Sequence, residues 1–257
     1  MKHIIKVFLI VLLASCQESK QKDLPDSEQV SAQEIIDKTI EASGGNNFGR
    51  SNIGFYFRDV YYTARRYKGD FSLSRINTIS GDSVIDILSN DGFARFINNE
   101  FQVIPDSMGV KYTASVNSVH YFSVLPYGLN DAAVIKQLLK TETIKNKEYY
   151  KIKVTFKENG GGEDYDDVFI YWINSETYKT DYLAYSYAEE DGIGLRFRAA
   201  FNERFIKGLR FVDYNNYKPK DKALNLENLG QQYSRDQLEL LSTIELEQLS
   251  VNLIDLN

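Results

Sequence analysis

Residues 115–139, SVNSVHYFSVLPYGLNDAAVIKQLL, interrupt a chain in which polar and apolar residues otherwise alternate over long distances. Apolar residues in this stretch recur at helical spacing on both sides of a proline. Asn117 is a suitable N-cap for a first helix, and Asn130 or Asp131 for a second. We therefore expect a helical crosspiece near residues 117–139, set between two β-rich halves.

The segments on either side of the crosspiece are typical of antiparallel strands. Their aromatic content is high, with 18 Tyr and 15 Phe in 257 residues, and such side chains favour pleated, half-buried surfaces. Turn sequences such as Lys68-Gly69 and Asn98-Asn99 separate the apolar runs. Residues 238–246 alternate and favour an edge strand over a helix. These patterns predict an α+β fold built on one large, curved antiparallel β-sheet, a half-barrel.

A short amphipathic helix precedes the strands. Ser31 and Glu34 form a capping box, Ile35 and Ile36 begin an apolar face, and two glycines at 44–45 end the segment. We expect this N-terminal helix to lie on the sheet.

The first residues are typical of a bacterial lipoprotein. Lys2 and Lys6 flank a short apolar run, and Leu13-Ala14-Ser15-Cys16 follows in the pattern of a lipobox. We therefore expect residues 1–15 to be a signal peptide and Cys16, the single cysteine, to carry the lipid. Gln17 after the cysteine is typical of sorting to the outer membrane, with the body facing either the periplasm or the cell surface.

Polar residues follow Cys16 as far as residue 30, which predicts a flexible tether, and residues 31–257 then read as a single β-rich domain. The formal net charge is −6, and removal of residues 1–15 would take away two further positive charges. An acidic body is a poor partner for nucleic acid, so we expect the N-terminal lipid to hold the protein at the membrane.

Catalytic and metal-binding patterns are sparse, and we expect no cofactor, no metal site and no catalytic residue. His120 lies within the apolar crosspiece, where a core position is expected. The single acidic cluster, Glu163, Asp164, Asp166 and Asp167, lacks the spacing of a calcium-binding EF-hand loop. A solvated hairpin tip is the simpler interpretation, and a calcium site remains its alternative.

Arginines placed within strands suggest either a solvated outer face or a cationic rim for an anionic head group. Arg196 and Arg198 share one face of their strand. Aromatic residues on both phases of several strands predict an apolar interior, which is either a ligand cavity or a solid core. The candidate ligand-binding residues are Tyr56, Tyr62, Phe122, Tyr171, Trp172, Tyr185, Arg196 and Arg198.

Four stretches together resemble an uncharacterised domain family of Bacteroidetes-type lipoproteins: SVNSVHYFSVLPYGLNDAAV, YYKIKVTFKENGGGEDYDDVFIYWIN, DYLAYSY and GLRFRAAFNERFIKGLRFVDYNNY. The resemblance covers residues 31–217 and implies no established activity. It implies a LolA-like architecture, that is, a half-barrel covered by helices that carries lipoprotein acyl chains or other lipids.

We therefore expect a membrane-anchored, non-enzymatic lipoprotein that binds a lipid or another hydrophobic ligand. One alternative is a structural or protein-interaction lipoprotein of the outer membrane with a solid core. A lesser alternative is a hydrolase that uses Asp166, Asp167 or His120. The sequence leaves open the ligand, any protein partner, the orientation and the oligomeric state.

Overall fold

The computed structural model describes residues 30–162, 165–189, 192–220 and 225–255. The predicted signal peptide and Cys16 lie outside these residues, as does the predicted tether up to residue 29. Residues 31–257 form one compact unit by themselves. All the strands and both hydrophobic clusters described below lie within this unit.

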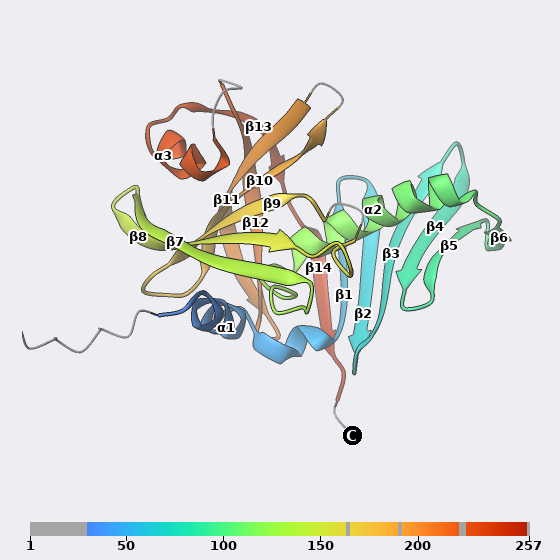
Figure 1. The fold of residues 1–257 in the computed structure, drawn as a ribbon. Coiled ribbons are helices and arrows are strands. Elements are labelled where there is room, and N and C mark those ends of the chain that lie inside the picture. The colour runs from blue at the N-terminus through green and yellow to red at the C-terminus, as the bar shows by residue number, and fades with distance from the viewer. Residues whose placement is uncertain (1–29, 163–164, 190–191, 221–224, 256–257) are drawn as a thin grey trace, which may run out of the picture. The chain divides into compact units, whose positions relative to one another are not determined.

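The described strands form two seven-stranded antiparallel sheets (Figure 1). The strands of sheet A lie in the order β14 (Glu247–Leu253), β1 (Arg50–Phe57), β2 (Val60–Tyr67), β3 (Asp70–Ile79), β4 (Asp82–Ser89), β5 (Gly92–Ile97) and β6 (Glu100–Gln102). The strands of sheet B lie in the order β13 (Leu238–Ile244), β12 (Leu209–Pro219), β11 (Gly192–Ile206), β10 (Thr180–Glu189), β9 (Val168–Asn174), β8 (Lys147–Phe156) and β7 (Val134–Ile144).

Tight turns join most neighbouring strands. Tyr67 pairs with Asp70 and Ile97 with Glu100, so each turn has two residues. The turn residues Lys68, Gly69, Asn98 and Asn99 all have positive φ, which matches the right-handed twist of the flanking strands. The predicted turns at these positions are confirmed.

The predicted α+β class and the open antiparallel half-barrel are confirmed by the two open sheets and the few helices of the described residues. The sequence predicted one sheet, whereas the strand pairing is divided in two between β13 and β14. These two strands follow each other in the chain, and β13 pairs with β12 while β14 pairs with β1. The expected edge strand at residues 238–246 is therefore present, and its continuation β14 is the edge of the other sheet.

The crosspiece is one helix, α2 (Asp106–Ser123), which lies across sheet A and contacts β3, β4 and β5 (Figure 1). It begins after Pro105, eleven residues before the predicted cap at Asn117. Proline is well suited to a helix start because its fixed φ is already helical and its missing N–H is not needed there.

The second predicted helix of the crosspiece is wrong. Residues 134–139 belong to β7, where Val134 pairs with Phe156 and Leu138 with Ile152. Single-sequence periodicity does not separate a short apolar run in a helix from one in a strand. Here β7 is the edge strand of sheet B, and pairing with β8 along one side, with a register shift between Leu139 and Glu142, holds it in the extended conformation.

Two hydrophobic clusters hold the unit together. The first lies between sheet A and α2 and includes Phe55, Tyr62 and Val116. The second lies on one face of sheet B and includes Trp172, Phe197 and Leu229. Leu229 begins a short helix, α3 (Leu229–Ser234), which follows the 3-10 turn η2 (Leu226–Asn228) and covers this face.

The N-terminal helix α1 (Ala32–Ala42) is as predicted. Its capping box between Ser31 and Glu34 is complete, and Ile35 and Ile36 are fully buried. A second 3-10 turn, η1 (Gly45–Gly49), leads into β1, and α1 lies against β7.

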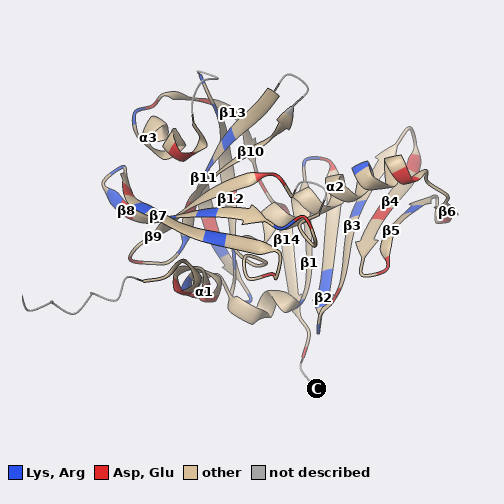
Figure 2. Ribbon diagram, viewed as in Figure 1, with Lys and Arg blue, Asp and Glu red and all other residues tan. Residues whose placement is uncertain are grey.

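Positive and negative residues are interspersed along both sheets in the view of Figure 2. Beneath α2, Asp86 is 1% exposed and lies between Arg75 and Arg95, with N···O distances of 2.5 and 2.6 Å. The guanidinium of Arg95 is stacked 3.5 Å from the ring centre of Tyr112 on α2, and Arg75 donates a hydrogen bond to Ser115. This ion-pair network therefore fixes α2 on sheet A.

Candidate functional site

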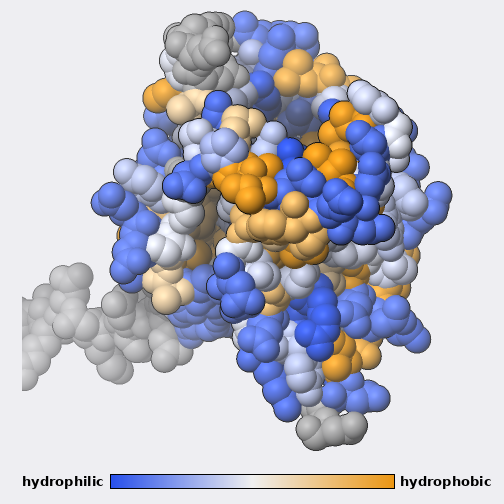
Figure 3. Space-filling view, turned by 90° about the vertical axis from the view of Figure 1, so that its right-hand side faces the viewer, coloured by the Kyte–Doolittle hydropathy of each residue, from blue (hydrophilic) through white to orange (hydrophobic). Residues whose placement is uncertain are grey.

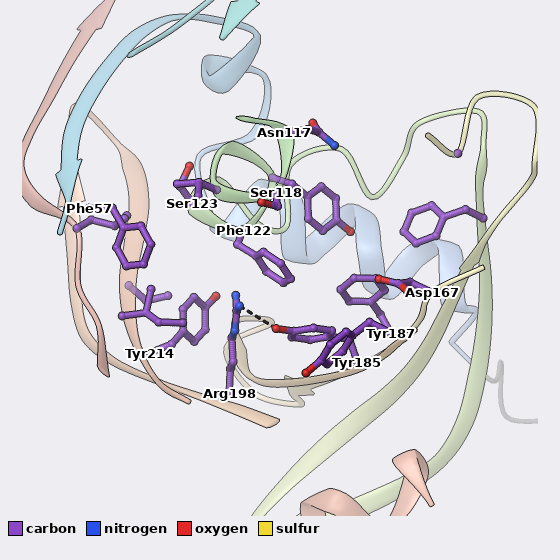
Figure 4. A pocket seen from close by; sticks show the side chains of 18 of the residues that line it. Phe57, Asn117, Ser118, Phe122, Ser123, Asp167, Tyr185, Tyr187, Arg198 and Tyr214 are labelled. Carbon is purple, nitrogen blue, oxygen red and sulfur yellow. Dashed lines mark hydrogen bonds between the residues drawn. The ribbon is translucent and has the colours of Figure 1, made fainter. Parts of the chain in front are cut away.

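A cavity of about 510 Å³ lies between α2 and the inner face of sheet B (Figure 4). The α2 wall includes Asn117, Ser118, Val119, Tyr121, Phe122 and Ser123, and the sheet wall includes Phe156, Phe169, Tyr185, Tyr187, Arg198, Val212 and Tyr214. Its volume is within the range of about 300–1,000 Å³ that is typical of small-molecule sites.

The sheet wall follows from the period of two in the strands. Alternate residues of β9 to β12 point to opposite faces of sheet B. Phe169 and Tyr185 face the cavity, whereas their sequence neighbours Ile170 and Ala184 belong to the core under α3. Both faces of sheet B are therefore apolar because each is covered, one by α3 and the other by α2.

Phe169 is at the centre of the aromatic wall. Its ring centre lies 5.4 Å from Tyr185, 5.8 Å from Phe156 and 6.0 Å from Phe122. These rings come from β9, β10, β8 and α2, so the contacts join the helix to the sheet around the cavity. Aromatic pairs in this distance range are stabilising beyond their buried area.

Arg198 is the cation of the sheet wall. Its residue is 8% exposed, its Nη2 donates a hydrogen bond to the Tyr185 hydroxyl at 3.0 Å, and its Cζ lies 3.7 Å from the ring centre of Phe122. Its Nε is buried, and within the described part of the chain it has no hydrogen-bond partner. Figure 4 shows the guanidinium between Tyr214 and Phe122, directed into the cavity.

Three tyrosines lie in or beside the cavity wall: Tyr171 and Tyr214 are buried, and Tyr121 is half-buried. The hydroxyl groups of Tyr121 on α2 and Tyr171 on β9 are 3.1 Å apart. Burial raises the pKa of Tyr171, Tyr121 and Tyr214, and for Tyr214 the positive charges of Arg210 and, to a smaller extent, Arg198 act in the opposite direction. All three are neutral phenols that can donate a hydrogen bond.

Acidic residues lie at the edge of the cavity. Asp166 and Asp167 are among the lining residues, and Asp166 is exposed. Glu163 and Asp164 of the same predicted cluster lie outside the described residues. Within the described ranges, no three or more His, Cys, Asp or Glu side chains are grouped so that they could hold a metal ion.

The structure brings together three of the candidate ligand-binding residues, Phe122, Tyr185 and Arg198, as lining residues of one cavity. Tyr171 is connected to this wall through the Tyr121 hydroxyl. Arg196, two positions from Arg198 on the same strand, lies 5.0 Å from the ring centre of Tyr187 and does not line the cavity.

The other three candidates lie elsewhere in the fold. Trp172 is on the opposite face of sheet B, where its Nε1 donates to Glu142 at 3.1 Å. Tyr62 is in the core of sheet A and stacks on Phe55 at 5.5 Å, and Tyr56 on the same sheet is 37% exposed. Sequence reasoning missed several lining residues that share the phase of Tyr185 and Arg198 on neighbouring strands, namely Phe169, Tyr187, Val212 and Tyr214.

His120 is a core residue. It is 1% exposed, its Nε2 donates to the Ser74 carbonyl at 2.9 Å, and its ring packs against Phe55 and Tyr62. Burial lowers its pKa to about 4. The structure therefore places His120 on the face of α2 that packs on sheet A and does not bring it together with Asp166 and Asp167 at the cavity.

The match to a family model covers residues 2–246, almost the whole chain, and the model is described as a family of unknown function, DUF6503. The chain belongs to this family. The sequence-based prediction of an uncharacterised domain family is thus confirmed. A comparison with curated proteins found no match. Within the described residues, no helix of this family member combines the length and the apolar character needed to cross a membrane.

Solved structures similar to this DUF6503 chain include a LolA superfamily protein from Nitrosomonas europaea, with 13% identity and a TM-score of 0.49 over 89% of this chain and 96% of the other. A putative outer membrane lipoprotein-sorting protein domain from Vibrio parahaemolyticus has 10% identity and a TM-score of 0.40, over 79% of this chain and 98% of the other. The lipoprotein LppX from Mycobacterium tuberculosis has 12% identity and a TM-score of 0.27, over 60% and 86%. The chain itself has two open antiparallel sheets, and helix α2 lies across one of them, which is the half-barrel arrangement that the sequence predicted.

Proposed function

We propose that this protein is a lipid-anchored envelope protein that binds a lipid or another hydrophobic ligand in the cavity between α2 and sheet B. The observation that carries the proposal is the cavity itself, about 510 Å³ of space with aromatic walls and one buried arginine. Each CH₂ group that moves from water to such walls contributes about 0.8 kcal/mol, so an acyl chain would bind favourably.

The anchor belongs to the same proposal. Lipidation of Cys16 would hold the body at the outer membrane, and the polar residues after it would act as the tether. A protein that is held at a membrane and has an apolar cavity is suited to capturing or handing over a membrane-derived molecule.

Mass spectrometry of the native protein tests the proposal. Residues 25–257 are expressed without the anchor, purified without detergent and extracted with organic solvent. We expect an apolar or amphiphilic molecule in about stoichiometric amount. Protein that yields no such molecule and also fails to take up a fluorescent fatty acid would overturn the proposal.

A second candidate function, a protein-interaction lipoprotein, is favoured by one exposed apolar surface. Phe101, Val103, Met108 and Val110 are 63%, 89%, 36% and 43% exposed at the end of sheet A where β6 leads into α2. Figure 3 looks onto this end of the molecule and shows apolar residues gathered among polar ones. Such patches often mark interaction sites.

Sedimentation velocity at micromolar concentration tests the second candidate. If this surface joins copies of the chain, residues 25–257 should sediment as an oligomer. The double variant Phe101→Ser, Val103→Ser should then sediment as a monomer. A monomer in both cases would count against self-association through this surface.

A further inference from the structure

We propose that the cavity selects anionic amphiphiles by binding a carboxylate head group on Arg198. This inference rests on the proposed function and names the class of ligand that the same cavity would take.

The buried and half-buried arginines within the strands differ in whether they have a carboxylate partner. Arg75 and Arg95 share the carboxylate of Asp86, and Arg204 and Arg210 pair with Asp213 and Glu203. Arg198 is buried, as Arg210 is, whereas Arg75, Arg95 and Arg204 are half-buried; yet within the described part of the chain Arg198 has no carboxylate partner.

A buried, unpaired charge is costly, and an arginine cannot give up its charge to avoid this cost. Arg66 also lacks a carboxylate partner in the described residues, but it does not line the cavity and lies 5.7 Å from the ring centre of Tyr127. Arg198 is therefore the buried arginine that faces open space, where a ligand can supply the missing negative charge.

The contacts of Arg198 leave its N–H edge available. Phe122 covers a face of the guanidinium at 3.7 Å and the ring centre of Tyr185 is 5.1 Å away, and such stacking does not use the N–H donors. The Tyr185 hydroxyl accepts from Nη2, and Nε is buried without a partner within the described residues, so the N–H groups that a ligand in the cavity can reach are those of Nη1 and Nη2. In-plane N–H groups are the donors that bind a carboxylate.

Neutral hydroxyl groups complete the head-group site. Tyr214 is 4% exposed and close enough to Arg198 for the two to interact electrostatically, and Figure 4 shows its hydroxyl directed toward the guanidinium. One guanidinium and neutral phenols match one negative charge, which a carboxylate carries and a phosphate monoester exceeds at neutral pH.

The negative charges at the edge of the cavity have the opposite effect on an anionic ligand from that of Arg198. Asp166 is exposed and Asp167 is half-buried, and both line the cavity. The exposed carboxylate of Asp166 repels an anion, whereas Arg198 attracts one. A carboxylate ligand is therefore expected to lie with its head group at Arg198, and its apolar part against Phe169 and the other rings.

Titration calorimetry of the body, residues 25–257, tests this inference. The delipidated protein is titrated at pH 7.5 with dodecanoate, dodecanol and dodecyl phosphate, each below its micelle concentration. We expect dodecanoate to bind at least about tenfold more tightly than dodecanol, since a charge-assisted hydrogen bond is worth that much or more. Equal affinities for the acid and the alcohol, or tighter binding of the phosphate than of dodecanoate, would overturn the carboxylate site.

Variants assign the preference to Arg198. Arg198→Gln should bind dodecanoate and dodecanol equally, and the control Arg65→Gln, which removes an exposed arginine of sheet A, should keep the preference. If Arg198→Gln still bound dodecanoate more tightly than dodecanol, Arg198 would not be the residue that binds the carboxylate. If this variant fails to fold, the acid-to-alcohol comparison in the native protein still decides. Binding of none of the three probes would instead contradict the proposed function itself.

Discussion

Asp213 on β12 accepts a hydrogen bond at 3.0 Å from the backbone N–H of Leu246, the residue just before β14 begins. Arg204 donates to the same Oδ1 of Asp213 at 2.9 Å and to the carbonyl of Leu246 at 2.8 Å. The backbone of Leu246 lies where strand pairing passes from sheet B to sheet A. The side chains of Asp213 and Arg204 therefore make the hydrogen bonds to the backbone of Leu246 that a neighbouring strand would otherwise make.

Replacement of Asp213 should strongly destabilise the protein. Asp213 is 2% exposed and also accepts from Asn202 at 2.6 Å, so Asp213→Ala leaves three donors without their acceptor. We expect the free energy of unfolding to fall by about 3 kcal/mol. Urea unfolding of the body measures this change.

Glu239→Ala is the control for Asp213→Ala. Glu239 pairs with Lys218 at 3.5 Å, and both side chains are largely exposed. Its loss should change the free energy of unfolding by less than about 0.5 kcal/mol. If Asp213→Ala were no more destabilising than this control, the hydrogen bonds of Asp213 would not be needed to hold the chain where it passes from sheet B to sheet A.

Two helical glycines should respond to alanine in opposite directions. A Cβ at Gly230 on α3 would lie 2.7 Å from Glu142 Oε1 and 2.9 Å from both Ile144 and Trp172, whereas one at Gly109 on α2 would meet nothing within 4 Å. Gly230→Ala should lower the free energy of unfolding by about 2 kcal/mol because α3 must move off sheet B. Gly109→Ala should raise it by about 0.5–1 kcal/mol. Thermal unfolding checks both, and equal effects would contradict the close packing of α3.

The buried His120 should make stability depend on pH. Its pKa falls from 6.5 to about 4 because it is buried; the hydrogen bond to the Ser74 carbonyl opposes this shift, and the positive charge of Arg66 adds to it. Between these two values the unfolded state binds the proton and the folded state does not. Stability from this group is therefore fully present above pH 6.5 and is lost as the pH falls toward 4, by about 3 kcal/mol in total.

His120→Gln isolates that contribution, because an amide can still donate to the Ser74 carbonyl but does not titrate. The free energy of unfolding of the native protein, minus that of the variant, should stay constant above pH 7 and fall between pH 6.5 and 4. Urea unfolding at several pH values gives this difference, in which carboxylates common to both proteins cancel. A difference that does not change with pH would mean that His120 is accessible to protons in the folded state.

Local signals explain which parts of the fold the sequence could predict. The capping box at Ser31 and the two-residue turns depend on neighbours a few positions apart, and both are correct. The strand β7 was taken for a helix because its identity depends on pairing with β8. The short helix α3 was missed because six residues carry too little periodicity, and its place is set by packing over Trp172.

The cavity was predictable only in part for the same reason. A period of two places Arg196 and Arg198 on one face of β11, but it does not say that only Arg198 lies under Phe122 of α2. Likewise, Tyr171 and Trp172 are adjacent aromatic residues of β9, and they face opposite sides of sheet B. Which face has open space depends on how α2 and α3 cover the sheet.

A bulky side chain on α2 should close the cavity without unfolding the protein. Ser118 lines the cavity from an exposed position of the helix, so Ser118→Trp places an indole in the space where the ligand is proposed to bind. Ser107, exposed in the first turn of the same helix, does not line the cavity, and Ser107→Trp is the matched control. We expect the Ser118 variant to take up a fluorescent fatty acid at least about tenfold more weakly than the native protein, because the indole displaces apolar contacts worth more than about 1.4 kcal/mol.

The Ser107→Trp variant should bind the fatty acid like the native protein, and both variants should keep the native melting temperature within a few degrees. Equal binding by the two variants would show that the fatty acid binds somewhere other than under α2.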